Sequence, residues 1–347
     1  MRKGWIGIFA ALLLLIPVGA AEYEAPRAPK SVEDLVPEKA DSFSEGLWNV
    51  VRSCAGEISP ALAEASGVCL RILAVSMLCA LVSVWSGKDT AFVLRMAGVA
   101  AVGTALVEPS AALMELGAET VRSLSEYGKL LLPVMTGALA AQGGGSTAAS
   151  LYTVTVFFDT VLSGAVSSLM IPMLYLFLGL AAGYAATKEP VLGKFRDLIK
   201  WGMQWVLKIA LYLFTGFLTV TGVVSGNADA AAIKAAKITI SGAVPVVGGI
   251  LSDASEAVLV GAGFMRSTVG VYGLITVAAL FLSPFVKMGS QYLLIKLTGG
   301  ICSSLLKEGP ASLIRDFATA MGLVLAAIAT QTALLLISTV CLMKGVL

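Results

Sequence analysis

The sequence predicts an all-α protein, a polytopic bundle of transmembrane helices. Hydrophobic residues make up 57% of the 347 positions and charged residues only 13%, and the mean hydropathy is +0.89. Several apolar runs reach the roughly 20 residues that a helix needs to cross a bilayer. The formal net charge of +2 is too small to indicate a nucleic-acid partner, and no basic cluster is interleaved with aromatic residues. The positions of the charged residues therefore indicate membrane topology and do not indicate a ligand.

Residues 1–21 have the pattern of a signal peptide. A basic start is followed by an apolar stretch at 5–18 and by small residues at 19–21. The stretch is shorter than the roughly 20 residues of a membrane span, which favours a cleaved signal peptide over the alternative, an uncleaved first helix. Cleavage would most simply follow Ala20 or Ala21.

The next segment, 22–66, is polar and carries nine acidic side chains against four basic ones. We expect it to form an extracytoplasmic leader that begins extended, because prolines stand at 26, 29 and 37, and that continues as short amphipathic helices on the outer surface. It is too small and too poor in apolar residues for a catalytic domain. The polytopic membrane domain then occupies 67–347.

Apolar runs long enough to cross the membrane lie at 68–85, 91–113, 203–224, 264–286 and 317–343. A longer run at 151–186 would overshoot a hydrocarbon core of about 30 Å as a straight helix, so we expect Pro172 either to kink it or to split it into a hairpin. The sequence therefore predicts about six to eight spans, of which the seventh and eighth are open.

Basic residues set the expected orientation. The segment 188–200 holds four Lys or Arg against two acids, and further basic residues lie in 287–315. Both segments are expected on the cytoplasmic side, with the leader and the acidic segment 115–127 outside. The side of the C-terminus stays open.

A weak internal repeat is visible at a shift of 112 residues. It places Pro133 on Pro245, Gly137 on Gly249 and Pro172 on Pro284. A shift of 119 residues carries the pair at 196–197 onto the pair at 315–316. We predict two parallel copies, about 91–202 and 203–320, followed by the final span 317–343. Chance alignment of apolar sequence is the alternative.

Each copy contains a short apolar segment interrupted by Pro and Gly, at 131–141 and at 243–253. Asp253 and Glu256 follow the second segment with the spacing of a capping box, so they are expected first as helix caps and alternatively as a polar lining. Irregular backbone at membrane depth must be covered by protein or water, so both segments are predicted to be broken or re-entrant elements at a pathway or an interface. The candidate structural or pathway residues are Pro133, Gly137, Asp159, Pro245, Gly248, Gly249, Asp253 and Glu256.

Asp159 is the ionisable residue that lies nearest the middle of an apolar run. Its side chain should face a partner or water. The sequence leaves open whether it has a functional role. The arginines and lysines near span ends, such as Arg71 and Lys208, are explained by snorkelling.

The sequence offers no candidate for catalysis. It contains no histidine, the five cysteines show no CxxC spacing, and the glycine-rich motifs that bind nucleotide phosphates are absent. We therefore expect no catalytic, cofactor or metal site and no enzymatic activity.

The stretches "LLLPVMTGALAAQGGGSTAA" and "KITISGAVPVVGGILSDASEAVLVGAG", with the signal-led acidic N-terminus, closely resemble the stage III sporulation protein AE family of endospore-forming bacteria. The resemblance runs from about Glu33 to the end of the chain. It implies a multi-pass protein of the mother-cell membrane around the forespore, acting in a secretion-like channel or feeding-tube complex. The implied partners are a secretion-type ATPase, ring-forming membrane proteins and a forespore-side partner.

Two function classes remain open. The first is a non-enzymatic core subunit of that channel complex, in contact with the lipid bilayer and open to forming a homo-oligomer. The second is an autonomous secondary transporter or permease built from the two repeats, which the paired broken segments would favour. A purely structural scaffold is the alternative to both.

Overall fold

The computed structural model describes residues 26–36, 43–85, 90–140, 145–220, 268–306 and 308–344. These residues form helices and short connections, with no strand among them, so the prediction of an all-α fold is confirmed. The elements are η1 (Glu33–Leu35), α2 (Phe43–Trp85), α3 (Ala91–Leu139), α4 (Gly145–Ala165), the π-helical η4 (Val166–Met170), α5 (Ile171–Thr187), α6 (Pro190–Val220), α9 (Thr268–Leu305) and α10 (Glu308–Lys344).

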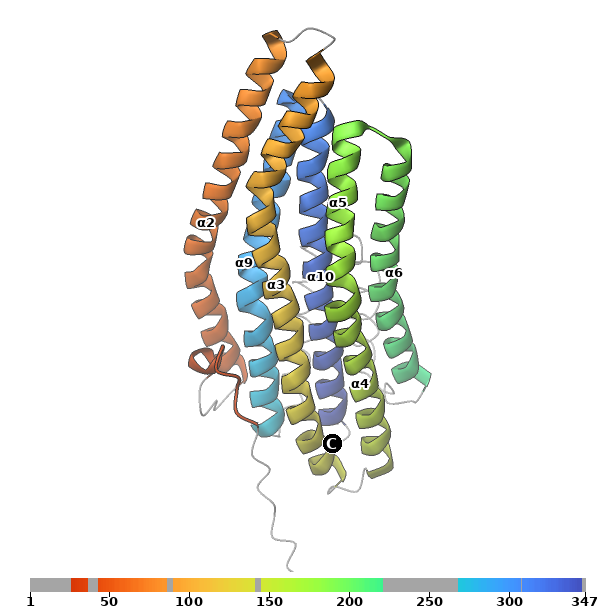
Figure 1. Cartoon of the computed structure of the whole chain (residues 1–347). Coiled ribbons are helices and arrows are strands. Elements are labelled where there is room, and N and C mark those ends of the chain that lie inside the picture. Colours follow the sequence, from red (N-terminus) through yellow and green to blue (C-terminus); the bar gives the residue numbers. More distant parts are fainter. Residues whose placement is uncertain are drawn as a thin grey trace, which may run out of the picture.

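The long helices lie side by side in an elongated bundle, with α10 between α3, α9 and α5 and with α2 and α6 at opposite edges (Figure 1). The helices α2, α4, α5 and α9 run one way, and α3, α6 and α10 run the other. We call the end where α5 turns into α6 and α9 turns into α10 the basic end, and the end where α2 begins the leader end. Residues 26–36 lie at the leader end, where the Ala28 N–H donates to Tyr272 Oη at 3.2 Å.

Five helical segments of the described chain are long and apolar enough to cross a membrane: Ser44–Trp85, Ala91–Ala138, Tyr152–Thr187, Val269–Leu305 and Gly309–Met343. These segments support the prediction of a membrane protein. The count of six to eight stays a prediction, as does the signal peptide, since residues 1–25 and 221–267 lie outside the described part.

The pair α2 and α9 shows how the bundle keeps register. Ser283 Oγ donates to Glu57 Oε2 at 2.8 Å, and Cys302 Sγ lies 3.3 Å from Ser76 Oγ. Both pairs join residues 226 positions apart, so the two helices pack in parallel and in register. These small polar contacts inside an apolar seam fix one relative position of the helices, which apolar packing alone would specify poorly.

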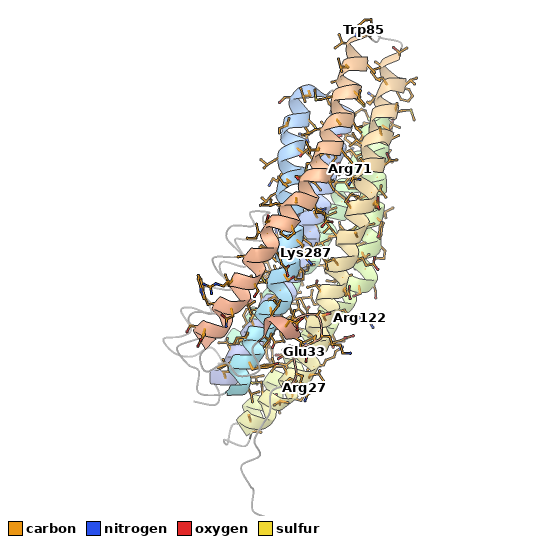
Figure 2. The ribbon with its side chains drawn as sticks, turned by 90° about the vertical axis from the view of Figure 1, so that its left-hand side faces the viewer. Arg27, Glu33, Arg71, Trp85, Arg122 and Lys287 are labelled. Carbon is orange, nitrogen blue, oxygen red and sulfur yellow. The ribbon has the colours of Figure 1, made fainter. Side chains whose placement is uncertain are left out.

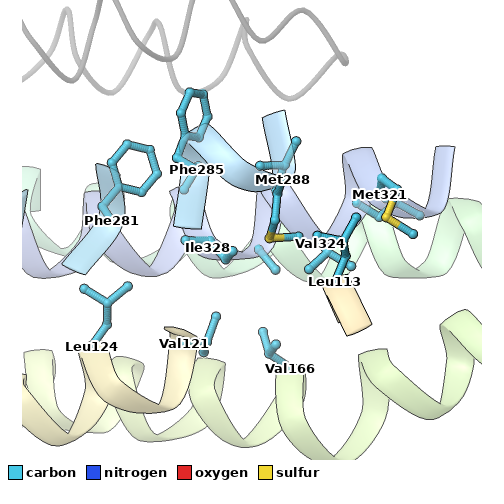
Figure 3. Close-up of a cluster of buried hydrophobic side chains, with 14 of the residues drawn as sticks. Leu113, Val121, Leu124, Val166, Phe281, Phe285, Met288, Met321, Val324 and Ile328 are labelled. Carbon is cyan, nitrogen blue, oxygen red and sulfur yellow. The ribbon is translucent and has the colours of Figure 1, made fainter. Parts of the chain in front are cut away.

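The hydrophobic core is assembled where α3, α9 and α10 meet the π-helical turn. Figure 3 shows this cluster, in which Phe281 and Phe285 of α9 lie with ring centroids 4.9 Å apart. The other labelled side chains come from α3, η4, α9 and α10: Leu113, Val121, Leu124, Val166, Met288, Met321, Val324 and Ile328. Close packing of this kind makes the α3–α10 contact sensitive to any added atom.

Two helices continue where the sequence predicts boundaries. The expected amphipathic helices of the leader join the span at 68–85 in one helix, α2, with Pro60 inside it. The expected outer segment and the expected broken segment around Pro133 and Gly137 are both part of α3, which runs to Leu139. Pro133 is exposed while its neighbours Leu131 and Leu132 are buried. Packing on the inner face therefore holds the helix together although proline removes one backbone hydrogen bond.

The long apolar run at 151–186 does not turn back on itself. The helices α4 and α5 follow one another along the same line, joined by the five π-helical residues Val166–Met170, and Pro172 occupies the first turn of α5 (Figure 1). The hairpin alternative is thus wrong. A wide π turn just before a proline gives the chain a place to absorb the missing backbone donor.

The described part of the predicted span at 203–224, residues 203–220, forms one helix, α6, with the basic segment before it, and α6 is not among the span-like segments of the described chain. The segment 188–200 and the described part of the segment 307–316, both of which we expect in the cytoplasm, begin at the same end of the bundle (Figure 1). Their cytoplasmic location stays a prediction, and so does the internal duplication.

Candidate functional site

The main candidate site is a buried polar cluster at Asp159 of α4. Only 1% of this residue is exposed, and both carboxylate oxygens have partners. Ser125 Oγ of α3 donates to Oδ2 at 2.6 Å, and Gln331 Nε2 of α10 donates to Oδ1. Three helices thus meet at one carboxylate, and the groups that it faces belong to its own chain.

A second polar contact continues the α4–α10 seam. Thr155, one turn before Asp159, donates from Oγ1 to Ser338 Oγ at 3.1 Å. Gly128 of α3 lies against the cluster, where a Cβ would stand 3.9 Å from Asp159 Oδ1. The seam is therefore polar over about two turns in the middle of an otherwise apolar contact, which is costly unless every group is satisfied.

One polar group of the cluster is not satisfied within the described part of the chain. Gln331 is fully buried, and its Oε1 has no hydrogen-bond partner there. No described lysine or arginine lies within ion-pair distance of Asp159. A buried carboxylate held only by neutral donors defines a unique helix register, because any slip would leave it unpaired. No group of three or more His, Cys, Asp or Glu that could hold a metal ion gathers among the described residues.

A charged face on the outside of α3 forms the second candidate. We define the α3 charged face as six exposed residues on one side of the helix: Glu108, Glu115, Glu119, Arg122, Glu126 and Lys129. Their spacing of seven, four, three, four and three residues keeps them in one stripe along the helix. Arg122 and Glu126 form an ion pair at 3.0 Å. Figure 2 shows Arg122 toward the leader end, far from Trp85 at the opposite tip.

The neighbouring helix α4 exposes apolar side chains at the same level as part of the α3 charged face. The contact between Ser125 and Asp159 sets the levels of α3 and α4 relative to each other. Near Asp159, the exposed side chains of α4 and η4 are Phe157, Val161 and Leu169, with exposed fractions of 61%, 51% and 47%. At this level α3 thus exposes charged side chains, and the adjacent helix α4 exposes apolar ones.

At the basic end, arginine side chains join neighbouring helices. Arg196 of α6 contacts Asp197 at 2.8 Å and Asp316 of α10 at 2.9 Å, and its guanidinium lies 4.9 Å from the Tyr184 ring centroid. Arg95 of α3 donates to the Ala186 carbonyl at the end of α5 at 2.8 Å. These contacts tie α6 to α10 and α3 to α5, so they hold the ends of neighbouring helices level.

The turn between α5 and α6 is built by the local sequence. Lys188 adopts φ 64° and ends α5, and its N–H donates to the Tyr184 carbonyl at 2.8 Å. Pro190 then begins α6, at a position where a helix needs no backbone donor.

The structure describes three of the sequence candidates, and it does not gather these three into one site. Asp159 joins the polar cluster, whereas Pro133 and Gly137 lie about two and three turns further along α3 from Ser125. Pro245, Gly248, Gly249, Asp253 and Glu256 lie outside the described residues. Sequence reasoning missed Ser125 and Gln331 as partners of Asp159. The sequence did contain one signal for this contact, because an amide such as Gln331 in the middle of the last apolar run is unusual.

Comparison with known proteins identifies the family of this chain. The sequence profile described as stage III sporulation protein AE matches residues 30–345. The chain belongs to the stage III sporulation protein AE family. This result confirms the resemblance seen in the sequence.

One curated relative is the stage III sporulation protein AE of Bacillus subtilis (strain 168), which is 23% identical over 187 residues. The matched part covers 54% of this chain and 47% of the relative, so the chain spans about half the length of the relative that it matches. No solved structure matches the chain. Family membership together with the span-like helices supports a membrane protein of sporulation.

Proposed function

We propose that this chain is a non-enzymatic integral membrane subunit of the secretion-like channel complex between mother cell and forespore. The observation that carries the proposal is the family match over residues 30–345 of a bundle with several span-like helices. The expected location is the mother-cell membrane around the forespore, with the leader outside the cytoplasm. The expected partners are a secretion-type ATPase, ring-forming proteins and a forespore-side partner.

The architecture supports a subunit over an independent machine. The buried polar contacts of the described bundle join neighbouring helices in pairs or threes, such as Ser125 with Asp159 and Gln331. They set helix register, and no reactive constellation accompanies them in the described part of the chain. A nucleotide-driven step would have to come from another protein, because the sequence has no phosphate-binding glycine motif.

One observation favours the second candidate, an autonomous secondary transporter. Asp159 is a buried carboxyl within a span-like helix, and such residues often mark ion or proton pathways in transporters. Ser125 and Gln331 of the same chain satisfy both oxygens of this carboxylate, which favours a role in setting helix register and therefore favours the subunit.

The sporulation role has a direct genetic test. Deleting the gene in its host should leave vegetative growth unchanged and reduce heat-resistant spores by orders of magnitude, with cells arrested after the forespore has been engulfed. A copy expressed in the mother cell should restore spores. A copy expressed only in the forespore is the matched control and should not. Normal sporulation of the deletion strain would contradict the proposal.

A further inference from the structure

The surface of the neighbouring helices α2, α3 and α9 changes character along the bundle. Toward the leader end, exposed charges interrupt it: Arg52 and Glu64 on α2, Lys287 on α9 and the α3 charged face. Toward the basic end, the described residues of these three helices expose no charge. We define the apolar girdle as the large apolar side chains exposed there: Met77, Leu78, Leu81, Val82, Phe92, Val93, Met96, Leu297, Ile301 and Leu305.

The last exposed charges before the apolar girdle lie at one level on all three helices. Residues of α2 and α9 that are 226 positions apart lie side by side, so Arg71 is level with position 297, next to Lys296. A Cβ at Gly98 of α3 would stand 3.5 Å from Cys79 Sγ of α2. Because α2 and α3 are antiparallel, eight residues toward the leader end on each helix make Arg71 level with position 106, close to Glu108.

The two basic side chains at this level both bend toward the leader end. Arg71 Nε donates to the Gly67 carbonyl at 3.4 Å, and Lys296 Nζ donates to Tyr292 Oη at 3.1 Å. Both acceptors lie one helical turn nearer the leader end. Long basic side chains at the edge of a hydrocarbon layer extend in this way toward water. Their direction therefore indicates water on the leader side and hydrocarbon on the side of the apolar girdle.

Burial separates the apolar girdle from the apolar core. The most apolar windows of α9 and α10 are 67% and 78% buried inside the chain, whereas those of α2 and α3 are only 22% buried. Core packing thus accounts for much of the apolar character of α10, and it does not account for that of α2 and α3. Trp85, which is 90% exposed at the tip of α2 (Figure 2), belongs to a residue type that is enriched at membrane–water interfaces.

The height of the apolar girdle is close to that of a thin hydrocarbon core. The stretch of α2 from Arg71 to Trp85 corresponds to about 21 Å, and the stretch of α3 from Ala91 to Val107 corresponds to about 24 Å. A typical hydrocarbon core is roughly 30 Å thick. Thinning of the bilayer and extension of the flanking charged side chains accommodate a difference of a few Å.

We infer that lipid hydrocarbon covers the apolar girdle and that the membrane boundary crosses α2, α3 and α9 at Arg71, Glu108 and Lys296. A planar boundary explains why three helices change at one level, whereas a protein partner would cover one face of the bundle. The leader-side parts of α2 and α3, with most of the α3 charged face, then stand in water. Since α4 exposes Phe157 and Val161 nearer the leader end, the bilayer crosses the bundle obliquely.

This inference rests on one part of the proposed function, that the chain is an integral membrane protein, and it does not depend on the proposed partners. Matched cysteines on two helices test it in the full-length chain, with the five native cysteines replaced and the protein reconstituted in phosphatidylcholine–phosphatidylglycerol liposomes. The girdle variants are Leu78→Cys and Val93→Cys, and the matched variants outside the girdle are Glu64→Cys and Glu119→Cys. All four positions are exposed, so the substitutions leave the core intact.

Each cysteine carries a bimane fluorophore, and two quenchers report on its surroundings. A nitroxide on the lipid acyl chains should quench the fluorophore at Leu78→Cys and Val93→Cys several-fold more than at the other two positions. Iodide in the water on both sides should show the reverse order. Girdle positions that neither quencher reaches would mean that protein covers them, and this result would overturn the inference.

Equal quenching by iodide at girdle and matched positions would also overturn the inference, as would strong quenching of Glu119→Cys by the lipid nitroxide. These readouts are independent of sporulation. A deletion strain that sporulates normally would refute the proposed role in the channel complex and would leave the position of the membrane boundary to the quenching result.

Discussion

Replacing Gly117 by alanine should be among the most destabilising single-methyl changes in this protein. A Cβ at this position of α3 would run into Val324 Cγ1 of α10 and would stand 3.5 Å from Met288 Cε. The backbones of α3 and α10 approach closely because the glycine leaves that space open. Overpacking of a dense core costs about 1–3 kcal/mol. The thermal unfolding midpoint of the purified protein in detergent should therefore fall clearly.

The chain offers a matched control and a rescue. A Cβ added at Gly164 of α4 would meet nothing within 4 Å, so Gly164→Ala should be neutral or stabilise by up to about 1 kcal/mol through helix propensity. Adding Val324→Ala to Gly117→Ala removes the clashing methyl groups and should recover part of the loss. A Gly117→Ala protein as stable as Gly164→Ala would show that α3 and α10 pack more loosely than the close approach at Gly117 implies.

The second large effect is expected at the Asp159 cluster. Gln331→Leu removes one of the two donors of a carboxylate that is 1% exposed. Hydrogen bonds to charged groups contribute about 1.5–3 kcal/mol, and leaving such a group unpaired adds a desolvation penalty. We expect a loss of roughly 2–4 kcal/mol in the free energy of unfolding, measured by denaturant titration in detergent.

A double-mutant cycle separates this pairing from simple packing. Asp159→Leu combined with Gln331→Leu replaces both partners by apolar side chains, so the double variant should lose less stability than the sum of the single variants. Asp159→Asn keeps polar atoms of nearly the same shape and should be the mildest change. Strict additivity of the two leucine variants would show that the Asp159–Gln331 hydrogen bond does not contribute to stability.

The class of fold is predictable from the sequence because apolar composition and run length are sufficient to indicate membrane helices. Most helix boundaries are not predictable from the sequence, because packing determines where the helices of this bundle end. Pro133 shows the reason: its local pattern predicts a break, yet Leu131, Leu132 and Met135 pack inward around it and α3 continues. The 43 residues of α2 likewise cross the predicted boundary at 66, because Ala61, Ala65 and Val68 form one buried stripe.

The site is predictable only in part for a related reason. An aspartate in an apolar run identifies Asp159, since a charge there needs a partner. The identity of the partners depends on how α3, α4 and α10 align, which has no local signature. Ser125 lies 34 residues away and Gln331 172 residues away. The acidic segment at 115–127 resembles an outer connection by composition alone, whereas its heptad-like spacing indicates a helix with one charged face.

We propose above that the chain acts as one subunit of a larger membrane assembly. The most direct measurement is purification of the tagged, full-length chain from sporulating mother-cell membranes in mild detergent, followed by mass spectrometry of its components and their stoichiometry. The account predicts several copies of the chain together with a secretion-type ATPase and ring-forming membrane proteins, with the same tag on a vegetative membrane protein as the control. A chain that purifies alone, and that by itself moves a small solute across liposome membranes, would contradict it.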